Sequence, residues 1–378
     1  MKPFDGASGL IPLPGSPTGN QPESLFMRRV GRGSRHVVLV PGNNCSGAVF
    51  NPLLRRVAES PGLFDAFSFY APDYRGSGLS TYHSPIRSLT DFARDFEQAL
   101  DQIADLPETG VTLAGYSMGA AVALEMMTLN PGRYGALISL AGVGPRGLRM
   151  AFADSLSGTD DLGNTWAPGD WPPVDDERKA MAALDFRQRR LQNGGRTYQS
   201  LQIIWDLFVY NDVLGIHPKT LAAQKPRFRQ HPDYINTFLD ALTVHFMPES
   251  SLAIHQFNLT STALEHTNAD GTKIIIPGNG RLKDAVAGKK ILMVKGHTDY
   301  NTWRGDLVIG DGDFAEAEAD FRDAGCGVTA LLIPPGRGYD HGFPVSFPRA
   351  TLALMDGWLN GAPKDQLVTA LLCGENPV

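Results

Sequence analysis

The residues best suited to chemistry are a serine and the two glycines around it, in the segment Gly115-Tyr116-Ser117-Met118-Gly119. This G-x-S-x-G pattern follows an apolar run at 111–114, expected to be a strand, and precedes a helix expected at 120–129. In such a sharp turn the glycines let strand and helix approach closely, so the serine hydroxyl stands clear above the sheet. The helix N-terminus favours negative charge at the same point. Ser117 is therefore the predicted nucleophile.

A serine hydroxyl is a weak nucleophile near neutral pH and needs a base within hydrogen-bond reach. Of the nine histidines, His341 alone lies in a glycine-rich loop, which follows a strand expected at 328–333. Loops beyond the carboxyl ends of parallel strands are where open α/β sheets bind their ligands. We therefore expect His341 to be the catalytic base.

The base must in turn be oriented by an acid. Asp299 follows a strand expected at 290–295, which gives the chain order serine, acid, histidine that this chemistry has on an α/β sheet. The position after the strand that ends at Ala141 carries no carboxylate. Asp340 stays an alternative, although its place next to His341 makes a side-chain contact awkward. Asp299 is the predicted orienting acid.

Acyl transfer also needs amide donors for the developing oxyanion. The backbone amide of Met118 comes directly after the nucleophile, and a second amide is expected from the loop after the strand at 36–40. Asn43 is the predicted second donor, and Asn44 is the alternative. Both asparagines are also typical turn formers, a role that would not exclude the backbone one.

These residues must be positioned by a sheet, and apolar runs alternate with helical patterns on both sides of the serine. The alternation predicts a doubly wound, mostly parallel α/β sheet. The first two expected strands, joined by a Gly-Arg-Gly-Ser turn, are expected to pair as a hairpin. Strands are expected at 24–30, 36–40, 66–70, 111–114, 136–141, 290–295 and 328–333, and helices at 89–103, 120–129, 314–324 and 350–359.

The alternation of strands and helices breaks between residues 145 and 288, where aromatic residues and helix-like stretches are separated by proline-rich turns. This segment is expected to be a mainly helical cap, or lid, inserted into the core. The predicted organisation is an N-terminal extension at 1–22, a core at 23–144 and 289–378, and the cap insertion at 145–288.

In these features the chain resembles the α/β-hydrolase fold superfamily, in its capped, esterase-like branch. The resemblance rests on the strand and loop that end in Pro41-Gly42, on Asp73-Tyr74-Arg75-Gly76-Ser77-Gly78-Leu79-Ser80, and on the segment around Ser117. It implies a nucleophile elbow at the serine, an oxyanion hole after the first parallel strand, and a serine esterase activity. Asp73 and Arg75 are expected to anchor their turn. Pro41 stands where many members of the family have histidine.

Composition excludes several other classes of protein. The formal net charge of −6 lacks the basic excess needed to bind a nucleic acid backbone tightly. The three cysteines have neither metal-ligand nor disulfide-scaffold spacing, which favours a reducing compartment and a cytoplasmic location. The first 22 residues have no apolar run typical of a signal peptide, and no membrane span is expected.

Neither a cofactor nor a metal is expected. The segment Gly142-Val143-Gly144-Pro145-Arg146-Gly147 formally matches a dinucleotide-binding pattern, but Pro145 removes an amide that would face the pyrophosphate. The histidines of the expected insertion have no tight ligand spacing.

The predicted function is therefore hydrolysis of a carboxylic ester, lactone or related acyl compound through an acyl-enzyme. The partner is a small acyl substrate with an apolar part, and the sequence leaves the oligomeric state open. An acyltransferase or a carbon–carbon bond hydrolase with the same triad is the alternative, and a non-catalytic ligand-binding protein on this fold is a more remote one.

Overall fold

The computed structural model describes five stretches of the chain. They comprise residues 8–14, 23–148, 253–267, 273–297 and 306–373, apart from residues 44, 61, 82, 85, 87, 255–256, 307–308, 335–338 and 340. Most of the expected cap insertion therefore lies outside the described residues. The same is true of the expected N-terminal extension, apart from residues 8–14.

The described core is built on an eight-stranded sheet with the strand order β1-β2-β4-β3-β5-β6-β9-β10. Six strands, from β4 through β3, β5, β6 and β9 to β10, run parallel, whereas β1 and β2 pair antiparallel at one edge. The strands are Gly9–Pro12 (β1), Ser24–Gly31 (β2), Arg35–Val40 (β3), Phe67–Pro72 (β4), Val111–Tyr116 (β5), Tyr134–Leu140 (β6), Lys290–Gly296 (β9) and Gly327–Ile333 (β10). The predicted mostly parallel α/β sheet is confirmed.

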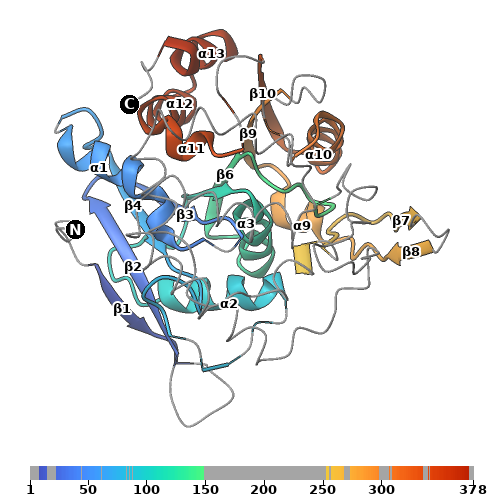
Figure 1. Cartoon of the computed structure of the whole chain (residues 1–378), viewed down its shortest axis with the longest axis horizontal. Helices are drawn as coiled ribbons and strands as arrows, with labels where there is room; N and C mark the ends of the chain where they lie inside the picture. Colours follow the sequence, from blue (N-terminus) through green and yellow to red (C-terminus); the bar gives the residue numbers. More distant parts are fainter. Residues whose placement is uncertain are drawn as a thin grey trace, which may run out of the picture.

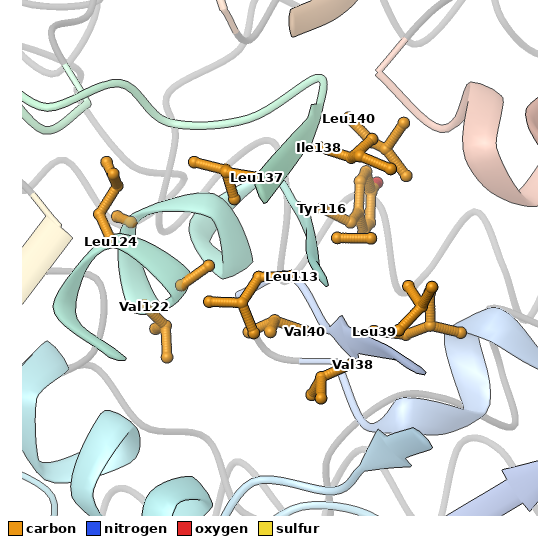
Figure 2. Close-up of a cluster of buried hydrophobic side chains, with 14 of the residues drawn as sticks. Val38, Leu39, Val40, Leu113, Tyr116, Val122, Leu124, Leu137, Ile138 and Leu140 are labelled. Carbon is orange, nitrogen blue, oxygen red and sulfur yellow. The ribbon is translucent and has the colours of Figure 1, made fainter. Parts of the chain in front are cut away.

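The central strands are apolar along nearly their whole length because both faces of the sheet are covered. Every residue of β4 and β5 is buried, and so are the last four residues of β3. Continuous apolar runs of this kind are typical of parallel strands covered by helices on both sides. Figure 2 shows a part of this core, in which Val38, Leu113, Leu137 and Val122 bring together β3, β5, β6 and the helix that follows Ser117.

The helices form two groups, and the helices of each group pack against one another (Figure 1). One group contains Leu89–Leu100 (α2), Met118–Leu129 (α3), Leu282–Val286 (α9) and Asp311–Asp323 (α10). The other contains Asn51–Glu59 (α1), Phe343–Ser346 (α11), Pro348–Leu359 (α12) and Lys364–Cys373 (α13), and a short 3-10 helix at Gly47–Phe50 (η1) precedes α1. None of the described helices is long and apolar enough to cross a membrane.

The hairpin expected between the first two core strands is wrong. β2 pairs antiparallel with β4, and β4 lies between β2 and β3. The turn between β2 and β3 instead passes close to the start of β4, where only glycine fits. A Cβ on Gly31 would lie 2.2 Å from the Phe67 carbonyl oxygen, and one on Gly33 would lie 1.9 Å from the Ala66 carbonyl carbon.

The described ends of the expected insertion lie next to each other. The Leu148 amide donates to the Ile254 carbonyl oxygen at 3.2 Å, and the Leu259 amide donates to the Pro145 carbonyl oxygen at 2.8 Å. Arg146 holds the first of these segments on α10 through two hydrogen bonds to the Asp320 carboxylate. A separate two-stranded sheet of Leu264–Thr267 (β7) and Lys273–Ile276 (β8) follows.

Candidate active site

Ser117 lies at the carboxyl end of β5, between that strand and the first residue of α3. Its backbone has φ 54° and ψ −123°, a conformation that a residue with a side chain rarely adopts. Three backbone hydrogen bonds hold it there. The Ser117 amide donates to the Leu140 carbonyl at 3.2 Å, and the Ser117 carbonyl accepts from the Ala120 amide at 3.1 Å and from the Val143 amide at 2.9 Å. The strand-to-helix turn therefore fixes where the serine hydroxyl points.

The two glycines of the serine motif are required by close contacts on both sides of the turn. A Cβ on Gly115 would lie 2.4 Å from the Cα of Ala120, at the start of α3. One on Gly119 would lie 2.1 Å from the carbonyl oxygen of Val40, at the end of β3. The helix can therefore begin directly against two strand ends only because both positions are glycine.

His341 lies beside the serine although 224 residues separate them in sequence. Its Nε2 is 2.9 Å from the Ser117 Oγ, and its side chain is 13% exposed. The imidazole is thus within reach of the serine proton and mostly shielded from solvent. These two predicted residues are brought together at the carboxyl edge of the sheet.

The other imidazole nitrogen is held by Asp306, a residue that the sequence motifs did not identify. The Nδ1 of His341 is 3.1 Å from the Asp306 Oδ1, and the Asp306 side chain is fully buried. An ionised carboxylate can only accept hydrogen bonds, so this contact places the imidazole proton on Nδ1 and leaves Nε2 to accept from the serine. The predicted acid Asp299 and its alternative Asp340 lie outside the described residues.

Asp306 is positioned by a close approach at the end of β9. A Cβ on Gly296 would lie 1.6 Å from the Tyr339 carbonyl oxygen and 3.4 Å from the Asp306 amide nitrogen. This glycine therefore lets the acid and the segment before His341 meet at one strand end. The Ile309 amide also donates to the Asp306 Oδ1 at 3.0 Å, which fixes the carboxylate relative to the start of α10.

The backbone amides expected to bind an oxyanion belong to two segments next to the serine, the start of α3 and the loop after β3. Met118 is the first residue of α3, where helix amides lack intrahelical acceptors. The loop after β3 also lies against the serine, because a Cβ on Gly42 would lie 3.3 Å from the Ser117 Cβ. Asn43 is the next residue of that loop, and Asn44 lies outside the described residues.

The loop after β3 is held in place by residues 73–80, the segment that resembles a family motif. The Tyr74 hydroxyl donates to the Pro41 carbonyl oxygen at 2.6 Å. The Asp73 carboxylate accepts from the Gly47 amide at 2.8 Å and from the Leu79 amide at 2.9 Å, and it pairs with Arg28. Burial raises the pKa of Asp73, and Arg28 opposes that rise. These contacts agree with the anchoring role expected for Asp73.

The only described cysteine near the serine is poorly suited to act as a nucleophile. Cys45 follows the oxyanion loop, and its amide donates to the Gly42 carbonyl at 3.2 Å. Burial raises the pKa of the Cys45 thiol to about 12, so almost none of it is thiolate near neutral pH. Among the described residues, no cluster of histidine, cysteine and acidic side chains could hold a metal ion.

The glycine-rich segment after β6 has a packing role. A Cβ on Gly144 would lie 2.8 Å from the Ala317 Cβ of α10, and Gly147 has a φ of 76° beside the Ile254 carbonyl oxygen. Arg146 in the same segment is bound to Asp320. These contacts account for the two glycines without a phosphate group.

Comparison with known proteins points to one family. The model of the alpha/beta hydrolase family matches residues 37–260. A search of curated proteins found no match.

Solved structures with this fold include several hydrolases at low sequence identity. A thermophilic esterase from Thermogutta terrifontis is 16% identical with a TM-score of 0.53, over 94% of this chain and 98% of that one. A hydrolase from Pseudomonas aeruginosa is 16% identical with a TM-score of 0.54, over 94% and 100% of the two chains. An enol-lactonase from Burkholderia xenovorans is 13% identical with a TM-score of 0.51, over 89% and 97%. At these identities the similarity establishes the fold alone.

Proposed function

Because the chain belongs to the alpha/beta hydrolase family, we propose that it is a serine hydrolase that cleaves a carboxylic ester, lactone or related acyl substrate. The observation that carries this proposal is the continuous hydrogen-bonded series from Ser117 through His341 to Asp306. A nucleophile, a base and an orienting acid in this order are the parts that acyl transfer requires.

The first half-reaction starts with the serine proton. His341 Nε2 takes the proton as Ser117 Oγ attacks the acyl carbon, and the 2.9 Å separation is within the range for direct proton transfer. The carbonyl oxygen then becomes an oxyanion, and the amides of Met118 and Asn43 are assigned to stabilise it. The protonated imidazole passes its proton to the leaving alcohol, which leaves an acyl group on Ser117.

The second half-reaction repeats the sequence with water as the nucleophile. His341 takes a proton from the water as its oxygen attacks the acyl carbon, and it returns the proton to Ser117 as the acid product leaves. In both halves the imidazole becomes positive, and the buried Asp306 carboxylate stabilises that charge. We therefore assign the role of orienting acid to Asp306 in place of Asp299.

The proposed substrate is a small acyl compound with an apolar part. The esterase and the enol-lactonase among the structural neighbours cleave ester-type bonds on the same fold, which supports this substrate class. A reducing, cytoplasmic setting is also proposed, and it is supported by Cys45 and Cys326, which are both free thiols in the described part of the chain.

The test is the hydrolysis of a series of p-nitrophenyl esters by the wild type and by Ser117→Ala. We expect turnover by the wild type and a loss of at least about a thousandfold in the variant, because the nucleophile is gone. Products are identified with and without added alcohols or amines. An acyl product that forms only when an acceptor is present would contradict hydrolysis and favour acyl transfer.

A further inference from the structure

The imidazole of His341 has a third described neighbour besides the serine and the acid. The two hydrogen bonds act at the two nitrogens of the ring. They fix two points of the imidazole but leave it free to tilt about the line that joins the two nitrogens. A further group in contact with the ring is needed to fix that tilt.

Tyr116 supplies such a group. Its ring centroid lies 5.4 Å from that of His341, and the two planes are inclined by 40°. This separation is within the range of favourable aromatic pairs. Tyr116 directly precedes Ser117 in sequence. The nucleophile and the side chain that packs against the catalytic base are therefore adjacent residues of the backbone.

The same ring contacts the loop of the expected oxyanion hole. A Cβ on Gly42 would lie 3.1 Å from both Cδ1 and Cε1 of Tyr116. The ring is therefore close to both the imidazole and the backbone that precedes Asn43. A shift of the ring would disturb both the base and one of the assigned oxyanion donors.

The ring is itself held firmly by the sheet. Tyr116 is 3% exposed and is paired in register with Leu140 of β6. Figure 2 shows its ring in the apolar cluster that includes Leu39 and Leu140, at the carboxyl end of the strands. A side chain packed in this way has little freedom to turn, so it can transmit the rigidity of the core to the imidazole.

We propose that Tyr116 is a positioning residue, whose ring sets the tilt of the His341 imidazole and supports the Gly42 backbone. This inference rests on the proposed serine hydrolase function. Because Tyr116 acts through the base and the oxyanion loop, its ring is expected to affect kcat and leave KM nearly unchanged. A flat ring is the requirement, so phenylalanine is expected to replace tyrosine.

The test compares Tyr116→Phe, Tyr116→Leu and Tyr116→Met in the full-length protein. For each variant we would measure kcat and KM on a p-nitrophenyl ester, the rate of fluorophosphonate labelling at Ser117, and the thermal unfolding midpoint. Methionine is included because its flexible side chain fills irregular space, which gives a second ring-free variant if the leucine variant does not fold. Tyr70→Leu is the matched control, since Tyr70 is a fully buried strand tyrosine on β4 outside the site.

We expect Tyr116→Phe to stay within about threefold of the wild type in kcat, and the folded ring-free variants to lose about 10- to 100-fold in kcat and in labelling rate at similar KM. The Tyr70 control is expected to lose stability but not kcat. A folded ring-free variant with wild-type kcat would overturn the inference, and so would a phenylalanine variant as slow as leucine. Wild-type protein that neither turns over ester nor labels at Ser117 would instead refute the proposed function.

Discussion

Replacing Asp306 by asparagine removes the negative charge opposite the base while keeping the size of the side chain. At the observed 3.1 Å between Nδ1 and Oδ1, Coulomb's law with an effective dielectric constant of about 20 gives about 5 kcal/mol for the pair of charges formed in the transition state. Each 1.36 kcal/mol corresponds to about a tenfold change in rate, so the upper value is about 10⁴-fold. Because both charges are delocalised, we expect kcat to fall about 10³- to 10⁴-fold.

The assay is ester turnover by Asp306→Asn, with Asp299→Asn as the matched control from the same inter-strand segment. The asparagine amide can also donate to Nδ1 and so favour the tautomer that cannot accept the serine proton. KM is expected to change little, and Asp299→Asn is expected to stay close to the wild type. Asp306→Asn with more than a tenth of wild-type kcat, together with a large loss in Asp299→Asn, would show that the acid had been assigned wrongly.

Three further predictions concern the elements around the site. Gly119→Ala is expected to destabilise the protein by about 3 kcal/mol or to prevent folding, because its Cβ would meet the end of β3. Gly312 is also the second residue of a helix, but it has open space around it. Gly312→Ala is therefore expected to raise the free energy of unfolding by up to about 1 kcal/mol. Equal changes in the thermal unfolding midpoints of the two variants would contradict this reasoning. Iodoacetamide is expected to leave esterase activity intact, because burial raises the pKa of Cys45 to about 12; inactivation that tracks alkylation of Cys45, measured by mass spectrometry, would refute it. Replacing residues 149–252 by a short glycine-serine linker is expected to leave a folded core, because the segments on either side are hydrogen-bonded to each other; loss of a cooperative unfolding transition would show that the core depends on that segment.

The serine can be predicted because the pattern that marks it is local in sequence, although β3 and the segment around Leu140 also contact its turn. β5, the turn and α3 follow one another, and the glycines on both sides are required by contacts within this unit and with the end of β3. The strands and helices around it were found for the same reason, since apolar periodicity within each segment reports its own burial.

The Nδ1 partner of His341 could not be read from spacing alone. A long segment separates β9 from α10, so the chain order serine, acid, histidine admits more than one aspartate. Asp306 reaches the imidazole because Gly296 lets its backbone and that of Tyr339 approach the same strand end. That contact joins segments distant in sequence, and no local pattern encodes it.

The pairing of the first strands was missed for a related reason. A short Gly-Arg-Gly-Ser turn between two apolar runs is typical of a hairpin, but β4 enters the sheet between β2 and β3. The glycines of the turn are needed because the turn passes close to the backbone at the start of β4. Which strands become neighbours depends on the whole sheet, whereas the turn residues depend only on the local backbone conformation.

Ser117 is proposed to be a nucleophile that His341 activates. Labelling with a fluorophosphonate probe, followed by mass spectrometry of the modified peptide, tests this claim in the wild type, Ser117→Ala and His341→Ala. We predict one adduct on Ser117 in the wild type, no adduct in the serine variant, and labelling slowed at least about a hundredfold in the histidine variant, since general base assistance contributes 10²- to 10⁴-fold. An adduct at another residue, or none in folded wild-type protein, would contradict the claim.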